Sequence, residues 1–193
     1  LGLTPGAFGS VGIWAPVRRG GGNPVPDTGS RQQGVRSYFW TVRDVVREGL
    51  LRFMFAESGD ERSQVADLVA RVESILARDA RDDPDRPATV VFDEAGSQRR
   101  IRNFEELCAY IDEKLSDEES GWIRYASAGT VSAFLRRLDA ARFHCGHLIK
   151  GDDAPEPEAH RIDWESQQVS VIDIHNLHDR AKRFVVGVVV KRL

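Results

Sequence analysis

The sequence predicts an α/β protein in which a largely helical insertion separates the strands of one sheet. Two apolar runs, residues 11–15 and 169–174, are typical of buried strands and lie near opposite ends of the chain. Four stripes of apolar residues at helical spacing occupy the region between them. Hydrophobic residues make up 41% of the 193 residues, which is enough for a core and excludes a disordered chain.

Residues 1–40 are expected to form a strand and a long loop of the sheet-bearing core. The apolar run 11–15 is closed by Pro16, which has no N–H to continue a strand ladder. Residues 18–34 are rich in Gly and Pro, which interrupt regular structure. A loop of this length inside a compact domain is usually functional or mobile.

Residues 41–150 are expected to form the helical insertion, which also carries a small hairpin. Thr41 is predicted to cap a first helix, because its hydroxyl can accept a backbone N–H, and the apolar stripe of this helix extends to Phe53. A second helix is predicted from the stripe between Val65 and Leu76. Residues 79–87 form a charged linker that contains two prolines.

The second half of the insertion contains the hairpin and two more helices. Residues 90–93 and 99–102 are predicted to pair around a turn at Ala95-Gly96-Ser97. Asn103 is expected to begin the third helix, with Glu106 completing a capping box. The fourth helix is predicted to cover residues 130–143.

Residues 151–193 are expected to form an acidic loop followed by a core strand and a crossover helix. The apolar run 169–174 is followed by a short polar link and by a second apolar segment, residues 181–190. A strand with one crossover segment is half of a parallel α/β unit. Because the chain also begins with Leu1 rather than Met, we expect it to be an internal piece of a larger α/β protein.

Composition limits the partners and the compartment. The formal net charge of −3 excludes a global basic field that would attract nucleic acid. Only four of the basic residues are lysines, so either planar arginine contacts or a codon bias explains the excess of Arg. No apolar run is long enough to predict a membrane span. Two cysteines, Cys108 and Cys145, suit a reducing cytoplasm.

The sequence contains no motif for nucleotide chemistry. A P-loop requires glycines followed by Lys and Ser or Thr, whereas this chain has no Gly-Lys dipeptide, and residues 18–22 place two arginines before the glycines. Two runs resemble a strand that ends in a magnesium-binding carboxylate. The run ending in Asp93-Glu94 is better explained by the hairpin, and Asp173 lacks a neighbouring Glu and favours a structural role. We therefore predict no catalytic or nucleotide-binding residue.

Histidines and cysteines suggest two further interpretations. His144-Cys145-Gly146-His147 brings three possible zinc ligands together, but a zinc site also needs a fourth ligand and suitable spacing, so no metal is predicted. His175 and His178 follow the strand at 169–174. Such residues can lie in an active site of an α/β sheet, but we favour capping of the next helix.

Arginines are the candidates for contacts with phosphate. Arg136 and Arg137 lie beside the inward Leu135 on the fourth helix. They form either a solvated, ion-paired face or a contact with phosphate or with the nucleotide of a neighbouring subunit. Flexible arginines of the long loop can reach DNA phosphates without sequence choice, although a loop with no ligand is the alternative. The DNA-binding candidates on that loop are Arg18, Arg19, Arg31 and Arg36.

Several segments carry a family resemblance through their order. They are VPDTGSRQQGV at residues 25–35, FWTVR at 39–43, Ser63-Gln64, TVSAFLRRL at 130–138, GHLIKGD at 146–152, and the closing segment 171–187. In this order they resemble HerA-type ATPases, bacterial relatives of the HerA/FtsK group of P-loop DNA motors. The segment between residues 79 and 121 does not contribute to the resemblance.

The resemblance implies a partial RecA-like P-loop ATPase core with a helical insertion. It implies a homo-hexamer in the cytoplasm that uses ATP and Mg²⁺ to translocate duplex DNA, acting with a nuclease or another effector in DNA-end processing or anti-phage defence. The Walker A motif would precede Leu1 and the Walker B motif would follow Leu193, so no catalytic residue is transferred to this chain. The segment alone is expected to be inactive.

Two alternatives stay open at this point. Residues 184–190 are rich in β-branched residues, which favour a strand, whereas the resemblance implies a buried helix, and we follow the resemblance. The alternative function is a non-enzymatic helical module that docks a nuclease or effector partner. The amphipathic helices and the charged loops at 79–86 and 152–158 suggest it.

Overall fold

The structure of the chain is a computed structural model. The structure describes residues 8–20, 24–29, 33–55, 64–94, 96–117, 119–124, 126–163 and 165–193. Arg31, Ser63 and Ala95, which the sequence analysis singled out, lie outside the described residues.

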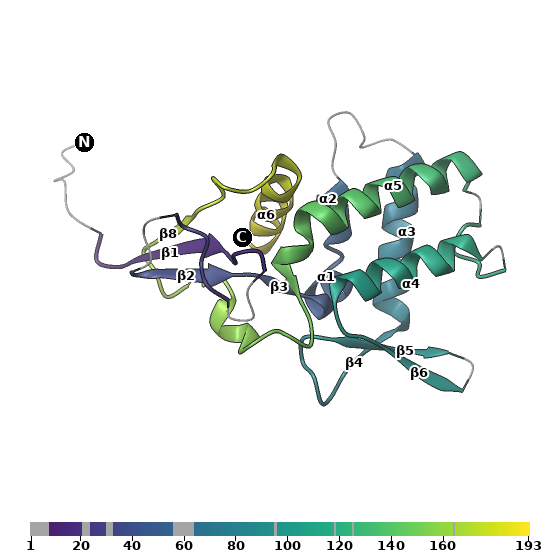
Figure 1. Cartoon of the computed structure of the whole chain (residues 1–193), viewed down its shortest axis with the longest axis horizontal. Coiled ribbons are helices and arrows are strands. Elements are labelled where there is room, and N and C mark those ends of the chain that lie inside the picture. Colours follow the sequence, from purple (N-terminus) through teal and green to yellow (C-terminus); the bar gives the residue numbers. More distant parts are fainter. Residues whose placement is uncertain are drawn as a thin grey trace.

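A parallel three-stranded sheet joins the two ends of the sequence (Figure 1). Its order is β2-β1-β8, with β1 (Val11–Pro16) between β2 (Val35–Tyr38) and β8 (Val169–Ile172). Val11 pairs with Val169, and Ile13 pairs with both Val35 and Val171. Chain segments from either side of the helical region therefore share one sheet, as expected for an α/β protein with a helical insertion.

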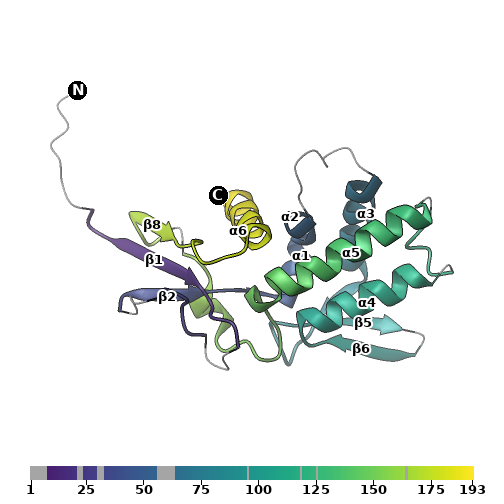
Figure 2. The same ribbon diagram turned by 45° about the horizontal axis from the view of Figure 1, so that its top comes forward.

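Helix α6 (Asp179–Arg192) connects this sheet to the helices of the insertion. It lies beside the sheet and packs against α2 (Leu51–Phe55) and α5 (Ala128–Cys145), as two views show (Figure 2). The segment 184–190 is thus helical, which confirms the interpretation taken from the family resemblance over the strand preference of its valines. Packing against two helices overrides the intrinsic propensity.

The insertion begins with two short helices where the sequence predicts one. Thr41 caps α1 (Val42–Glu48) through a capping box with Asp44, and the helix then ends at Gly49, whose φ of 62° is left-handed. The predicted single helix from Thr41 to Phe53 is therefore wrong. A left-handed glycine stops α1, and α2 starts in a new direction.

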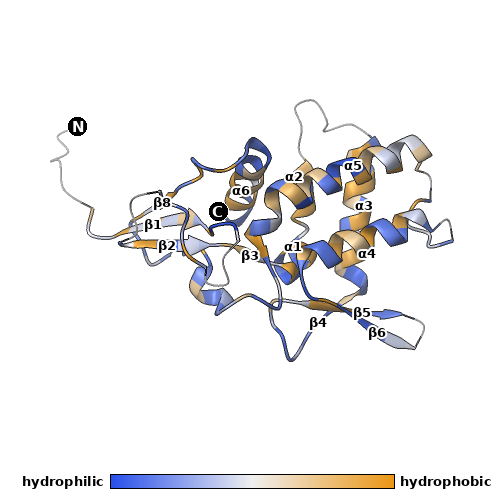
Figure 3. Ribbon diagram, viewed as in Figure 1, coloured by the Kyte–Doolittle hydropathy of each residue, from blue (hydrophilic) through white to orange (hydrophobic). Residues whose placement is uncertain are grey.

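Three longer helices complete the insertion. They are α3 (Gln64–Asp79), α4 (Phe104–Ser116) and α5, all close to their predicted positions. Each has polar and apolar residues on different faces, which Figure 3 shows by colour for α3 and α5. Asn103 caps α4, but Glu106 does not complete the predicted capping box, because its carboxylate accepts the backbone N–H of Arg102 instead.

Small strand pairs lie at the border of the insertion. The predicted hairpin is confirmed as β5 (Val90–Glu94) and β6 (Ser97–Ile101). The predicted linker 79–87 contains a third antiparallel strand, β4 (Ala80–Asp82), and the sequence analysis also misses β2. Two residues of β3 (Trp40–Thr41) pair with β7 (Ile149–Lys150), so the beginning and end of the insertion meet.

One hydrophobic core extends from the sheet through the insertion. Trp40 of β3 lies edge-on to Phe184 of α6, with ring centroids 4.9 Å apart, so an aromatic contact joins the two parts. Phe55 and Phe134 make a tilted ring contact between α2 and α5, with centroids 4.8 Å apart. Burial of each such ring stabilises the fold by roughly 1.5–3 kcal/mol. This core holds α5 and α6 in fixed positions beside the sheet.

Candidate functional site

The candidate site lies where β1 leads into its loop and where α5 ends and α6 begins. Arg19 follows β1, and its Nη2 donates to the carbonyl oxygen of His144, 3.3 Å away. Its guanidinium also lies 5.8 Å from the ring centroid of Phe143. Both residues belong to the last turn of α5, which the buried Phe134, Leu138 and Cys145 fix in the core. The loop after β1 is thus attached to the end of α5.

Two imidazole rings stack at the centre of the site. The rings of His144 and His178 are 3.6 Å apart, with an angle of 13° between their planes. His178 is the N-cap of α6, because its Nδ1 accepts the backbone N–H of Arg180 at 3.2 Å. This confirms the capping role favoured for His178 from the sequence.

Positive charge surrounds this pair of histidines. Desolvation and the neighbouring His178, Arg180 and Arg19 lower the pKa of His144 below its usual value. The imidazole of His144 is therefore neutral at pH 7.

A hollow of about 480 Å³ opens beside His144 on the surface of α5. Phe143 borders it with a side chain that is 70% exposed, and Arg136 of the same helix also borders it. The hollow also contains Glu105 and Asp139, which are 3.3 Å and 2.7 Å from the guanidinium of Arg142. Arg136 forms no ion pair within the described parts of the chain. We call Arg19, Arg136, Phe143, His144 and His178 the Phe143 surface.

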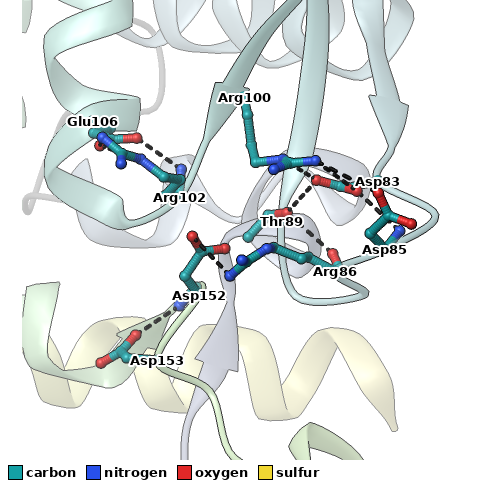
Figure 4. Close-up of polar contacts among 10 residues, drawn as sticks. Asp83, Asp85, Arg86, Thr89, Arg100, Arg102, Glu106, Asp152 and Asp153 are labelled. Atoms are coloured by element: carbon teal, nitrogen blue, oxygen red, sulfur yellow. Dashed lines mark hydrogen bonds and ion pairs between the residues drawn. The ribbon is translucent and has the colours of Figure 1, made fainter.

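A larger cavity of about 630 Å³ lies elsewhere, at the start of α4. All of its charged lining residues are paired, as Figure 4 shows for Arg102 with Glu106 and for Asp152 with Arg86. Lys150 pairs with Asp153 in the same way. Because each charged side chain around this cavity has a partner of opposite charge, we interpret the region as a structural contact between α4 and residues 150–153. It is a poor candidate for binding a charged ligand.

A buried carboxylate supports the neighbouring turn. Asp83 accepts hydrogen bonds from the backbone of Asp85 and the hydroxyl of Thr89, and it pairs with Arg100 (Figure 4). These contacts fix the segment between β4 and β5.

The arginines predicted to contact DNA are separated in the structure. Arg18 lies 4.0 Å from Asp27 within its own loop, and Arg36 of β2 stacks over the ring of Trp14 at 5.1 Å. Arg31 lies outside the described residues. Arg137 is half-buried on α5, whereas Arg136 is exposed. Of the six candidates, only Arg19 and Arg136 border the same pair of residues, Phe143 and His144.

The possible metal ligands and acidic strand ends have other roles. Cys145 is fully buried in the core, and the described residues contain no group of three or more metal-ligating side chains. Asp93 and Glu94 of the hairpin pair with Arg81 of β4 and Lys114 of α4, respectively. Asp173 accepts the backbone N–H of His175 through its carboxylate, which is a structural contact.

Sequence analysis missed Phe143 and the stacking of the two histidines. A signal for Phe143 exists, because a large aromatic residue lies outside the inward positions Phe134, Leu138, Ala141 and Cys145 of α5. The contact between His144 and His178 has no local signal, since it joins two helices that are distant in the sequence.

Comparisons with known proteins add no family. No protein-family model matches the chain, and no curated protein matches it. In the part of the chain that the structure describes, each helix is too short or too polar to cross a bilayer.

Proposed function

We propose that this chain is the central part of a HerA-like, ATP-driven DNA translocase that works as a homo-hexamer in the cytoplasm. The observation that carries the proposal is the ordered series of segments, from residues 25–35 to 171–187, that resemble the HerA-type ATPases. Within this proposal the chain supplies part of a RecA-like core and its helical insertion, and the nucleotide motifs belong to flanking segments.

Two features of the structure support this proposal. The first is the parallel β2-β1-β8 sheet, in which a helical region is inserted between β2 and β8. The second is α6, which follows β8, lies beside the sheet (Figure 1) and packs against α2 and α5. Parallel sheets with helical crossovers are the architecture of P-loop ATPases, although many other functions use similar sheets.

Under this proposal the complete motor uses ATP and Mg²⁺, and its substrate is duplex DNA. The nuclease or effector partner, and the role in DNA-end processing or anti-phage defence, also come from the family resemblance. Since the chain has no Gly-Lys dipeptide, we expect the 193-residue segment alone to bind no ATP.

ATP hydrolysis by the full-length protein is the direct test. We expect hydrolysis that rises when duplex DNA is added, and a molecular mass in solution that corresponds to six subunits. A full-length protein that hydrolyses no ATP, or one that stays monomeric with ATP and DNA, contradicts the proposal. Micromolar binding of ATP to the isolated 193-residue chain, measured by calorimetry, contradicts the assignment of the nucleotide motifs to the flanks.

A further inference from the structure

Phe143 combines high exposure with a fixed position. Its side chain is 70% exposed, although it belongs to a helix whose opposite face is buried in the core. The ring of His144 meets it edge-on at 4.9 Å, and the guanidinium of Arg19 lies 5.8 Å from its centroid. An exposed aromatic ring beside a guanidinium is the combination on which the bases of a single nucleic-acid strand stack.

The charges around Phe143 favour an anionic partner. Arg19 contacts the His144 carbonyl oxygen and the Phe143 ring but no carboxylate of the described chain. Arg136 adds a second exposed guanidinium at the hollow. The two carboxylates in the hollow, Glu105 and Asp139, are neutralised in part by Arg142. The surface is therefore locally positive although the whole chain has a formal charge of −3.

We propose that the Phe143 surface binds an unpaired DNA strand, with a base stacked on Phe143 and the adjacent phosphates held by Arg19 and Arg136. This inference rests on the proposed function, because it takes DNA as the partner, and it narrows the partner at this surface to a single strand. In the interior of a duplex, neighbouring bases cover both faces of each base, so an internal base can stack on a protein ring only when it is unpaired.

The groups of the Phe143 surface are already held in position in the protein without a bound strand. Arg19 is tied to the end of α5 by its hydrogen bond to His144, and α5 is fixed by its buried face. The stack between His144 and His178 joins the same end of α5 to the start of α6. Ordering these groups in the free protein reduces the entropy lost on binding.

Fluorescence anisotropy with a labelled thymidine dodecamer tests the proposal on the complete 193-residue chain. We expect the single strand to bind more tightly than a duplex of the same length. Phe143→Ala is expected to weaken binding of the single strand about tenfold, whereas Phe143→Tyr retains it, because stacking needs only an aromatic face. Arg19→Ala is expected to weaken binding and to reduce the slope of log affinity against log salt by about one.

A dodecamer with abasic sites in place of the central thymidines separates stacking from charge. It should bind about tenfold more weakly than the intact strand, and Phe143→Ala should then cause no further loss. The matched controls are Val190→Ala, which removes an exposed apolar side chain from α6, and Arg78→Ala, which removes an exposed guanidinium from α3. Both are expected to bind like the parent chain.

Several outcomes overturn the inference. These are equal affinity of the parent chain and Phe143→Ala for the intact strand, equal affinity for intact and abasic strands, and competition by poly-glutamate that matches competition by the thymidine strand. The proposed function fails separately. DNA-stimulated ATP hydrolysis by a full-length protein whose Phe143 surface binds no single strand overturns only this inference, and stacking-dependent binding without any hydrolysis overturns only the ATPase proposal.

Discussion

The ring of Phe53 lies directly against the backbone of Gly187, where α2 and α6 cross. A Cβ atom added to Gly187 would lie 2.4 Å from Cδ1 and 2.8 Å from Cγ of Phe53. Cγ and Cδ1 of Phe53 lie close to the backbone of α2, so they cannot move away from an added Cβ unless α2 itself shifts. The glycine therefore sets the distance between the two helices.

We expect Gly187→Ala to destabilise the protein by about 1 kcal/mol. Overpacking at this contact costs roughly 1–3 kcal/mol, and the gain of about 1 kcal/mol that alanine gives a helix offsets part of this cost. Urea denaturation measures the difference. The matched control is Gly129→Ala in α5, where the nearest atom to an added Cβ is 3.8 Å away, and we expect no loss there. If both variants lose the same stability, close packing at Phe53 is not the reason.

Asp44 is expected to help attach both α6 and the loop before β8 to the start of the insertion. It is buried, accepts the backbone N–H of Thr41 at 2.8 Å, and lies 3.1 Å from Arg161 and 3.6 Å from Arg192. Asp44→Asn keeps the volume but removes the charge, so we expect a loss of about 2 kcal/mol, less than for a fully buried pair because Arg161 is half-exposed.

Thermal unfolding of Asp44→Asn measures this loss. The comparison is Asp139→Asn, which removes the charge from an exposed pair with Arg142 and should change stability by less than about 0.5 kcal/mol. A similar effect of the two substitutions would show that burial of Asp44 contributes nothing.

His178 is expected to stabilise the first turn of α6 through its cap. His178→Ala removes the acceptor of the Arg180 N–H and the ring that stacks on His144, so we expect a loss of about 1 kcal/mol. His178→Asn restores a good capping group without the stack. Chemical denaturation of the two variants therefore separates the cap from the stack, and an Asn variant as unstable as the Ala variant would assign the effect to stacking alone.

Acid is expected to destabilise the fold through His147. Burial, Arg19 and Lys150 lower the pKa of His147 to about 4, and its Nδ1 is buried without a hydrogen-bond partner among the described residues. The unfolded chain takes up this proton near pH 6.5, so this contribution to stability is complete above about pH 6.5 and is lost as the pH falls towards 4.

We expect the loss from His147 to be on the order of 2 kcal/mol, reduced by solvent screening because the side chain is partly exposed. Urea midpoints between pH 7 and pH 4.5 measure it. His147→Leu should flatten the dependence in this range, while His175→Leu, at an exposed position, should not. An unchanged slope in His147→Leu would mean that other groups cause the acid sensitivity.

Much of the fold was predictable because local signals and packing agree. The stripe of α3 and the cap of α4 at Asn103 specify those helices directly. The predictions failed where long-range contacts decide. β2 is only four residues long and has no alternating pattern, and it exists because β1 provides its partner. Helix α6 was predicted correctly from the family resemblance, although its valines alone favour a strand, and Gly187 allows its backbone to lie against Phe53.

The candidate site was predictable only in part, since its members come from separate segments. Arg19 and Arg136 were identified by residue type, yet nothing in the sequence shows that both border the end of α5. Arg18 and Arg36 have the same chemistry, but contacts with Asp27 and Trp14 occupy them. Residue type thus selects candidates, and tertiary packing decides which of them meet.

The position of β1 at the centre of the sheet has a consequence for synthesis. β1 is translated before both of its partners, and its partner at Val35 follows soon, but its partner at Val169 is translated much later. At typical elongation rates this delay is on the order of ten seconds. Throughout that interval the edge of β1 that later pairs with β8 has no hydrogen-bonding partner on the nascent chain. We therefore expect ribosome-bound intermediates to recruit chaperones until β8 emerges.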